Sequence, residues 1–249
     1  MLKRKIYADL LAWKEKRRKE GLKKCLLLKG ARQVGKTYTV QEFGKNEYDS
    51  LISIDFFLQP ALKDIFAGEL SPQEIYKRIT GNIPAARLIP GNTLLFLDEI
   101  QCCGNARTAL KFLAEDLRYD VIASGSLLGL AYGEDVGEGV EEPASIPVGY
   151  ETQFTMYSLD FEEFLWAYGY PEETVNGLSE YMERDIQIPE SMHETYENIF
   201  REYMVVGGMP EAVADFSESK DFGRVFDIQK NIIAEYQDDI SKHAKGKEK

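Results

Sequence analysis

The chain has 249 residues, of which 44% are hydrophobic, so it can bury a sizeable core as one large domain or as one domain with a lid. No run approaches 18 consecutive apolar residues, and the opening MLKRKIY lacks the apolar segment and cleavage site of a signal peptide. We therefore expect a cytoplasmic protein without a membrane partner. Three cysteines, two of them adjacent, fit neither a disulfide framework nor a C-x-x-C metal site.

The net charge of −12 is unevenly distributed, because residues 1–24 hold ten Lys or Arg and three Asp or Glu. The remainder holds 20 basic and 39 acidic residues. An acidic body argues against a broad nucleic-acid-binding surface, since phosphate contacts dominate such binding. The basic start of the chain leaves contact with an acidic partner open.

Residues 1–20 are predicted to form a helix, with Ile6, Tyr7, Leu10 and Leu11 on its apolar stripe. The charged run from Lys14 to Glu20 is interpreted as a solvated helical face. Contact with nucleic acid or a membrane is the alternative for this run.

A short apolar strand then leads into GARQVGKT at residues 30–37, followed by a predicted helix from Lys36 to Phe43. Glycines at this spacing let backbone amides converge on phosphate oxygens, while Lys36 reaches the β- and γ-phosphates and the Thr37 hydroxyl takes a Mg²⁺. A plain glycine-rich turn with a surface lysine is the alternative. The predicted nucleotide-binding residues are Gly30, Ala31, Arg32, Gln33, Val34, Gly35, Lys36, Thr37 and Tyr38.

A second strand is expected at 51–55, followed by two short helices at 56–67 and 71–80. The next strand begins at Thr93 and is an apolar run that ends in Asp98 and Glu99. Ligands of open α/β sheets lie at the carboxyl ends of the strands, so both carboxylates are expected beside the phosphate loop. Asp98 is assigned to the metal with Thr37, and Glu99 is assigned to the attacking water.

A helix at 105–117 and a strand at 119–123 come next, and the strand is followed by Ser124-Gly125-Ser126. A polar residue at this position could sense the γ-phosphate or hold the water, and a serine at a turn or helix N-cap is the alternative. Ser126 is therefore a candidate catalytic residue, together with Lys36 and Glu99.

The acidic stretch at 133–149 is interpreted as a loop, and a fifth strand is predicted at 153–158. Only helices are expected afterwards, at 161–168, 172–185, 191–205, 210–216 and 222–240. The expected domains are therefore a P-loop core at 1–158, which includes the basic N-terminal helix, and a helical part at 159–249.

The motifs GARQVGKT, FLDEIQ, ASGSLLG, SLDFEEFL and GGMPEAV occur in this order over nearly the whole chain. With them the chain resembles a prokaryotic AAA-type (AAA+) P-loop ATPase family whose members usually carry an uncharacterised C-terminal domain. The resemblance implies an α/β fold with five parallel strands, in which the sensor strand lies between the P-loop strand and the Walker B strand, followed by a helical lid. It also implies a Walker A motif at Gly30 to Thr37, a Walker B motif at Asp98 and Glu99, and the cofactors ATP and Mg²⁺.

Two departures from the family pattern are visible. Pro147-Val148-Gly149-Tyr150 stands where members commonly have Gly-Arg before the fifth strand, and the sequence ends where relatives usually continue into the C-terminal domain. Arg32 and Arg107 are candidates for the missing arginine, although a structural or solvated role is the expectation for both. An arginine from a neighbouring subunit is the alternative.

The leading hypothesis is Mg²⁺-dependent ATP hydrolysis coupled to conformational change. The alternative is a slow-hydrolysing nucleotide-gated switch that binds a protein or DNA partner through the basic helix or the helical half. A homo-oligomer also stays open. A small-molecule P-loop kinase is a third reading, but the Asp-Glu pair favours activated water over an acceptor substrate.

Overall fold

The computed structural model describes residues 2–132 and 147–245, which form two compact units. The core unit spans Ile6–Met156, and the helical unit spans Tyr157–Lys242 together with the residues that precede Ile6. The predicted acidic loop falls mostly on residues 133–146, outside the described part of the chain.

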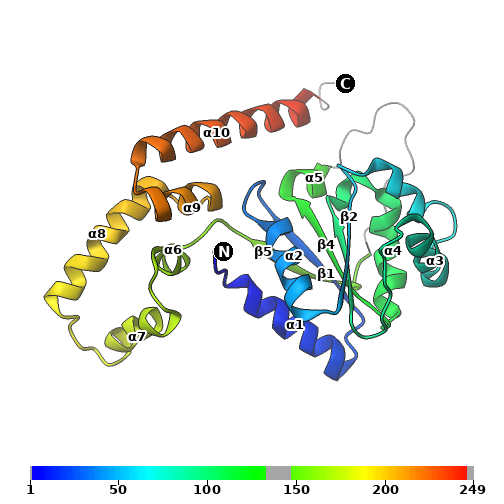
Figure 1. Cartoon of the computed structure of the whole chain (residues 1–249), viewed down its shortest axis with the longest axis horizontal. Coiled ribbons are helices and arrows are strands. Elements are labelled where there is room, and N and C mark those ends of the chain that lie inside the picture. Colours follow the sequence, from blue (N-terminus) through cyan, green and yellow to red (C-terminus); the bar gives the residue numbers. More distant parts are fainter. Residues whose placement is uncertain (1, 133–146, 246–249) are drawn as a thin grey trace. The chain divides into compact units, whose positions relative to one another are not determined.

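A five-stranded parallel sheet forms the centre of the core unit, in the order β2-β3-β4-β1-β5 (Figure 1). The strands are β1 (Cys25–Gly30), β2 (Ser50–Asp55), β3 (Thr93–Asp98), β4 (Asp120–Ser126) and β5 (Glu151–Met156). Strand β4 pairs with β1 on one side and with β3 on the other, which confirms the strand order that the resemblance implies. The strand that leads into the phosphate loop and the strand that ends in Asp98 therefore flank β4.

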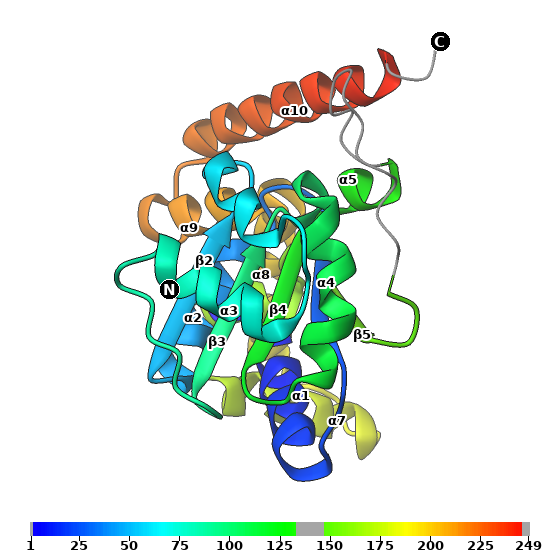
Figure 2. The ribbon, with the colours of Figure 1, turned by 90° about the vertical axis from the view of Figure 1, so that its right-hand side faces the viewer.

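Alternate side chains of the strands enter two separate apolar layers, as the period-2 geometry of a strand requires. Leu26 and Leu28 pack with α1 and α2 on one face, whereas Cys25 and Leu27 pack with α3 and α4 on the other. Figure 2 shows the face that α3 and α4 cover. The helices of this unit are α1 (Ile6–Glu20), α2 (Lys36–Glu47), η1 (Pro60–Phe66), α3 (Pro72–Asn82), η2 (Ile100–Cys102), α4 (Gly104–Glu115) and α5 (Leu127–Tyr132).

The basic run on α1 differs from the prediction at two residues. Lys14 and Arg17 are buried rather than solvated. Arg17 Nε donates to Asp120 Oδ1 at 2.7 Å, and its terminal nitrogens donate to main-chain carbonyls that include Tyr119 O. These charges are buried because they have partners, and they hold α1 on the sheet.

The segment at 56–67 also differs from the prediction, because the helix begins later and has 3₁₀ geometry. The Asp55 carboxylate accepts from the main-chain nitrogens of Phe57 and Leu58 at 2.9 Å each. This local turn competes with a helix, which starts instead at Pro60, where proline is tolerated.

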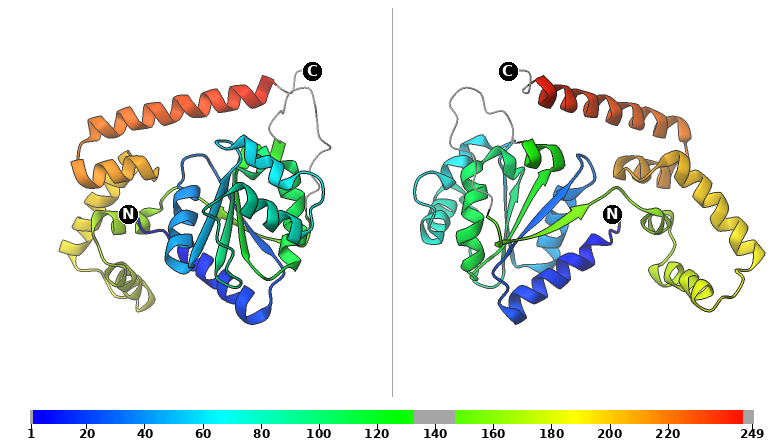
Figure 3. Two further views of the ribbon diagram at one scale, coloured as in Figure 1. Left: turned by 45° about the vertical axis from the view of Figure 1, so that its right-hand side comes forward. Right: turned by 180° about the vertical axis from the view of Figure 1, so that it is seen from behind.

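The helical unit contains five helices among its described residues, close to the predicted positions and drawn from yellow-green to red in Figure 3. They are α6 (Phe161–Tyr168), α7 (Glu172–Glu183), α8 (Glu190–Val206), α9 (Pro210–Ser219) and α10 (Phe222–Lys245). This unit has its own apolar core, which includes Phe164, Val213 and Phe216. A separate core is what allows the unit to be compact by itself.

The start of the chain belongs to the helical unit through contacts with the beginning of α6. Asp160 and Glu163 form a capping box there, and Glu163 Oε1 also accepts from Arg4 Nε at 3.2 Å and from the Lys5 main-chain nitrogen at 2.6 Å. Arg4 additionally donates to Tyr157 O at 2.6 Å. Within the described residues, no helix has the length and apolar character needed to cross a membrane.

Candidate nucleotide site

The predicted phosphate loop connects β1 to α2. Gln33 and Gly35 both have positive φ, 63° and 94°, which gives the loop the sharp curl that the motif predicts. Gly30 is required by close approach, since a Cβ there would lie 2.3 Å from the Met156 carbonyl oxygen on β5. No side chain caps the start of α2, so its first amides are accessible to an anion.

Lys36 is the first residue of α2, and its side chain is buried over the loop. Nζ donates to the carbonyl oxygens of Gly30 at 3.1 Å and Ala31 at 2.7 Å. Burial lowers the pKa of Lys36, and the nearby carboxylates of Glu99 and Asp98 act in the opposite direction. Lys36 therefore lies within electrostatic reach of both predicted Walker B residues.

The structure brings Thr37 and Asp98 into direct contact although 61 residues separate them. Thr37 Oγ1 donates to Asp98 Oδ2 at 2.6 Å, and Asp98 is 1% exposed. Ser124 on β4 donates its hydroxyl to the other carboxylate oxygen, Oδ1. Two hydroxyls, one from the start of α2 and one from β4, thus orient one buried carboxylate.

Glu99 follows directly and has a left-handed backbone, with φ 49° and ψ 50°, before η2 begins. Burial raises the pKa of Glu99, a hydrogen bond from Gln101 lowers it, and the Asp98 charge raises it further. A half-buried carboxylate with a raised pKa is a better proton acceptor than an exposed one.

Ser126 has a different neighbour from Ser124. Its hydroxyl accepts from the main-chain nitrogen of Gly129 at 3.0 Å, at the start of α5. This is the N-cap type of contact that the sequence left as the alternative. A catalytic role for Ser126 stays a prediction.

The remaining predicted loop residues have unequal exposure. Val34 is buried in the core with α1 and α2, so it can offer a ligand its main chain but not its side chain. Arg32 and Tyr38 are exposed. The Arg32 charge acts on the pKa of both Lys36 and Glu99, which locates it near the candidate catalytic groups.

Arg107 is held elsewhere. Its NH2 donates to Glu151 Oε2 at 3.0 Å, and this ion pair links α4 to β5 with both side chains largely buried. Burial lowers the pKa of Arg107 and raises that of Glu151. Arg107 therefore has a structural partner, as the sequence-based expectation proposed.

The sequence patterns predicted neither a role for Gln101 nor the contact of Ser124 with Asp98. Gln101 donates Nε2 to Glu99 Oε2. A polar residue two positions after Glu99, inside an otherwise apolar segment, was the available signal. The fold is needed to show that its side chain turns back to Glu99.

The donor set fits a Mg²⁺ ion that is shared with a nucleotide. Thr37 and Asp98 supply a hydroxyl and a carboxylate, which are the hard oxygen ligands that Mg²⁺ prefers. The described residues contain no group of three or more His, Cys, Asp or Glu able to hold a metal. Phosphate oxygens and water would therefore complete the shell, as is usual for Mg²⁺.

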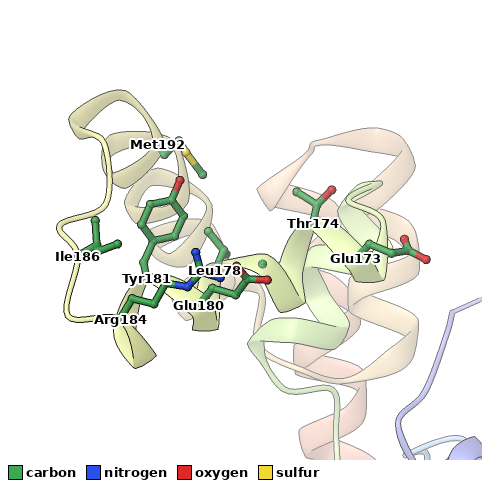
Figure 4. Close-up of a pocket in the computed structure, with 9 residues that line it drawn as sticks. Glu173, Thr174, Leu178, Glu180, Tyr181, Arg184, Ile186 and Met192 are labelled. Carbon is green, nitrogen blue, oxygen red and sulfur yellow. Dashed lines mark ion pairs between the residues drawn. The ribbon is translucent and has the colours of Figure 1, made fainter.

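A pocket of about 390 Å³ lies in the helical unit, between α7, the segment that follows it, and α8 (Figure 4). Tyr181, Arg184 and Met192 line it, along with Glu180 and Ile186. All its lining residues come from the helical unit, so it is separate from the P-loop residues.

Comparison with protein families matches residues 22–165 to an AAA domain and residues 197–249 to a domain of unknown function, DUF8612. A search of the curated proteins finds no match. The solved structures that resemble this chain include C. elegans PCH-2, with a TM-score of 0.42 and 14% identity over 87% of this chain and 61% of that one. AMPPCP-bound DnaA from Aquifex aeolicus has a TM-score of 0.42 and 14% identity over 86% and 60%. The chain thus spans less than two thirds of either structure.

The AAA match covers the phosphate loop, both predicted Walker B carboxylates and β4, which confirms the resemblance drawn from the motifs. The second match shows that a domain of unknown function is present at residues 197–249, whereas the sequence pattern led us to expect the chain to end before the C-terminal domain. The chain belongs to the AAA domain family and contains its nucleotide-binding P-loop fold.

Proposed function

We propose that this protein binds ATP with Mg²⁺ and hydrolyses it, and that the helical unit responds to the nucleotide state. The observation that carries the proposal is the convergence of Thr37, Asp98, Lys36 and Glu99 at the carboxyl end of the sheet. The phosphate loop alone accounts for binding. The buried carboxylate bound to Thr37 and the adjacent Glu99 add the groups that hydrolysis needs.

In this mechanism the main-chain amides of the loop and the start of α2 hold the phosphates, and Lys36 neutralises their charge. Thr37 and Asp98 would hold the metal, which supplies charge neutralisation at the phosphates when it is bound. Glu99 accepts a proton from water as the water oxygen bonds to the γ-phosphorus and the bond to the β-phosphate oxygen breaks. ADP and inorganic phosphate leave.

The test is ATP turnover by the purified protein with Lys36→Ala and Glu99→Gln. Lys36→Ala is expected to abolish binding and turnover, whereas Glu99→Gln retains binding and loses about a hundredfold or more in kcat. Lys45→Ala and Glu115→Gln are matched controls, because both side chains are exposed on α2 and α4. Wild-type protein that neither binds nor hydrolyses ATP contradicts the proposal.

The slow nucleotide-gated switch is the second candidate, and the Arg107–Glu151 ion pair favours it. Arg107 is the candidate arginine after Walker B, and its guanidinium is engaged by a structural carboxylate. Arginine supplied to the transferring phosphate speeds hydrolysis by about 10³ to 10⁵. A neighbouring subunit in a homo-oligomer is the alternative source.

Turnover measured across a range of protein concentrations separates these two cases. An arginine supplied by another subunit predicts a specific activity that rises with protein concentration and with the mass in solution. A switch predicts slow turnover at every concentration, together with nucleotide-dependent binding of a protein or DNA bait. Partner binding through the basic helix or the helical unit remains part of this second proposal.

A further inference from the structure

Gln101 is connected to the candidate catalytic centre by one directed hydrogen bond. Its amide nitrogen donates to Glu99 Oε2. Because an ionised carboxylate accepts hydrogen bonds and cannot donate them, the amide group must face Glu99 with nitrogen and not oxygen. The opposite atom of the amide, Oε1, is therefore turned away from Glu99.

Two glycines make room for the Gln101 side chain. A Cβ on Gly125, near the end of β4, would lie 2.6 Å from Gln101 Oε1, and a Cβ on Gly129, in α5, would lie 2.8 Å from Gln101 Cγ. Neither glycine has a φ in the left-handed region. Both positions therefore need glycine because a Cβ would collide with the Gln101 side chain, and not because of an unusual backbone conformation.

Packing alone does not explain a glutamine in this slot. Oε1 of Gln101 is buried and has no hydrogen-bond partner among the described residues. A buried acceptor without a donor lowers stability, and a methionine of similar length would fill the same space without that penalty. What a glutamine offers here that a methionine lacks is the amide N–H that donates to Glu99.

The main chain brings Glu99 and Gln101 together through an unusual turn. Glu99 has a positive φ, which is uncommon for a residue other than glycine, and its carbonyl accepts from the Cys102 nitrogen at 2.9 Å. Non-glycine residues in this region cost free energy and cluster at functional sites. The turn fixes where the Glu99 side chain begins, and the Gln101 bond restricts where its carboxylate ends.

We infer that Gln101 is a positioning residue, which holds the Glu99 carboxylate in one orientation and is itself held between Gly125 and Gly129. The inference rests on the proposed function, since it assigns how the base of that reaction is oriented.

The first test compares Gln101→Met with the wild type in ATP turnover and nucleotide binding. The volume is retained and the donor is lost, so kcat is expected to fall about ten- to a hundredfold while KM and the Kd for ATP change less than twofold. Gln73→Met, on the exposed part of α3, is the matched control and should leave kcat unchanged. A kcat for Gln101→Met within twofold of the wild type overturns the inference.

The second test changes the slot and leaves Gln101 and Glu99 themselves unsubstituted. Gly125→Ala places a methyl carbon 2.6 Å from Gln101 Oε1 and should reproduce the loss of kcat. Gly81→Ala in α3 is its control, because a Cβ there meets nothing within 4 Å. Equal kcat values for the two alanine variants contradict the role of the slot in holding Gln101.

The third test does not depend on turnover. In nucleotide-free protein, the side-chain amide signals of Gln101 can be assigned by NMR from their loss in Gln101→Met. They should exchange slowly with solvent and should shift in Glu99→Gln, where the charged acceptor is replaced. Gln101 amide signals whose chemical shifts are the same in Glu99→Gln as in the wild type overturn the inference. If the Gln101 amide signals shift in Glu99→Gln as expected but the wild-type protein hydrolyses no ATP, the proposed function is contradicted instead.

Discussion

The two serine hydroxyls near the end of β4 differ in what they contact, and that difference predicts different mutant phenotypes. Ser124 donates to the buried carboxylate of Asp98, whereas Ser126 accepts from Gly129 N. Groups that orient a metal ligand typically cost about 10- to 100-fold in metal affinity when removed. Ser124→Ala should therefore raise the Mg²⁺ concentration for half-maximal ATP turnover about tenfold.

Ser126→Ala provides the comparison for that measurement. Loss of a cap-type hydroxyl costs about 1 kcal/mol of stability, without an effect on the metal. A Mg²⁺ titration of turnover for both variants, with unfolding midpoints alongside, decides the matter. If Ser126→Ala shifts the Mg²⁺ requirement as much as Ser124→Ala does, the assignment of Ser124 to Asp98 is of no functional consequence.

Arg107 should affect stability and not turnover, because its partner is Glu151. Burial raises the pKa of Glu151 above its ordinary value of 4.5, and the Arg107 charge opposes this. Arg107→Met removes the opposing charge and leaves the largely buried carboxylate with the Gln153 amide, at 3.4 Å, as a hydrogen-bond donor, at a cost of about 3 kcal/mol near neutral pH. Turnover per folded molecule is expected to stay within twofold of the wild type.

The pH dependence of that loss has a definite sign. A carboxyl whose pKa is raised by folding stabilises the folded state fully below its unfolded pKa, and this contribution is lost as pH rises through the folded value. Arg107→Met raises the Glu151 pKa further, so the loss of stability should be larger at pH 8 than at pH 5. Thermal unfolding at both values checks this, with Arg201→Met in an exposed α8 ion pair as the control.

At the level of elements, α1 is fixed to the sheet by a polar network beneath its basic run. Arg17 bonds Asp120, and Asp120 Oδ2 also accepts from the Tyr48 hydroxyl at 2.8 Å. Arg17→Met leaves the buried Asp120 carboxylate with the Tyr48 hydroxyl but without its ion-pair partner, and should cost about 3 to 5 kcal/mol in the free energy of unfolding. Lys16→Met, one residue away and exposed, should change it by less than about 0.5 kcal/mol. Denaturant unfolding that gives similar losses for both variants refutes the network's role.

The same helix shows why sequence patterns predicted elements better than their surfaces. Apolar periodicity located α1 and the five helices of the helical unit, because each must bury one face. The burial of Lys14 and Arg17 depends on Glu47 and Asp120, which lie far away in the sequence. Likewise, β4 continues through Ser126 because Ser126 pairs with Gly30 on β1, and local composition carries no sign of that pairing.

For the candidate site, the sequence located the groups but not their contacts. The spacing of GARQVGKT and the end of an apolar strand are local signals, so Lys36, Thr37, Asp98 and Glu99 could be assigned from them. The bond from Ser124 to Asp98 requires β4 to lie beside β3, which is a property of the sheet. Gln101 requires, in addition, two glycines from β4 and α5.

At the scale of the whole molecule, the two units have separate apolar cores, and each contains one of the two tryptophans. Trp13 packs in the core unit, and Trp166 packs against the core of the helical unit. Nucleotide contacts proposed for the phosphate loop lie within the core unit. A ligand that binds only the folded form stabilises the unit that contains its site.

Single-tryptophan variants turn this arrangement into a measurement. In Trp166→Phe, emission from Trp13 reports the core unit, and Mg²⁺ with a non-hydrolysable ATP analogue at a hundred times its Kd should add about 2.7 kcal/mol to its stability. In Trp13→Phe, unfolding followed by the emission of Trp166 should show a much smaller nucleotide-dependent gain in stability, since its unit has its own core. Lys36→Ala should remove the nucleotide-dependent gain in stability that Trp13 reports. Equal gains in stability reported by both tryptophans would instead mean that the two units unfold as one cooperative body. The nucleotide would then stabilise the helical unit through the core unit.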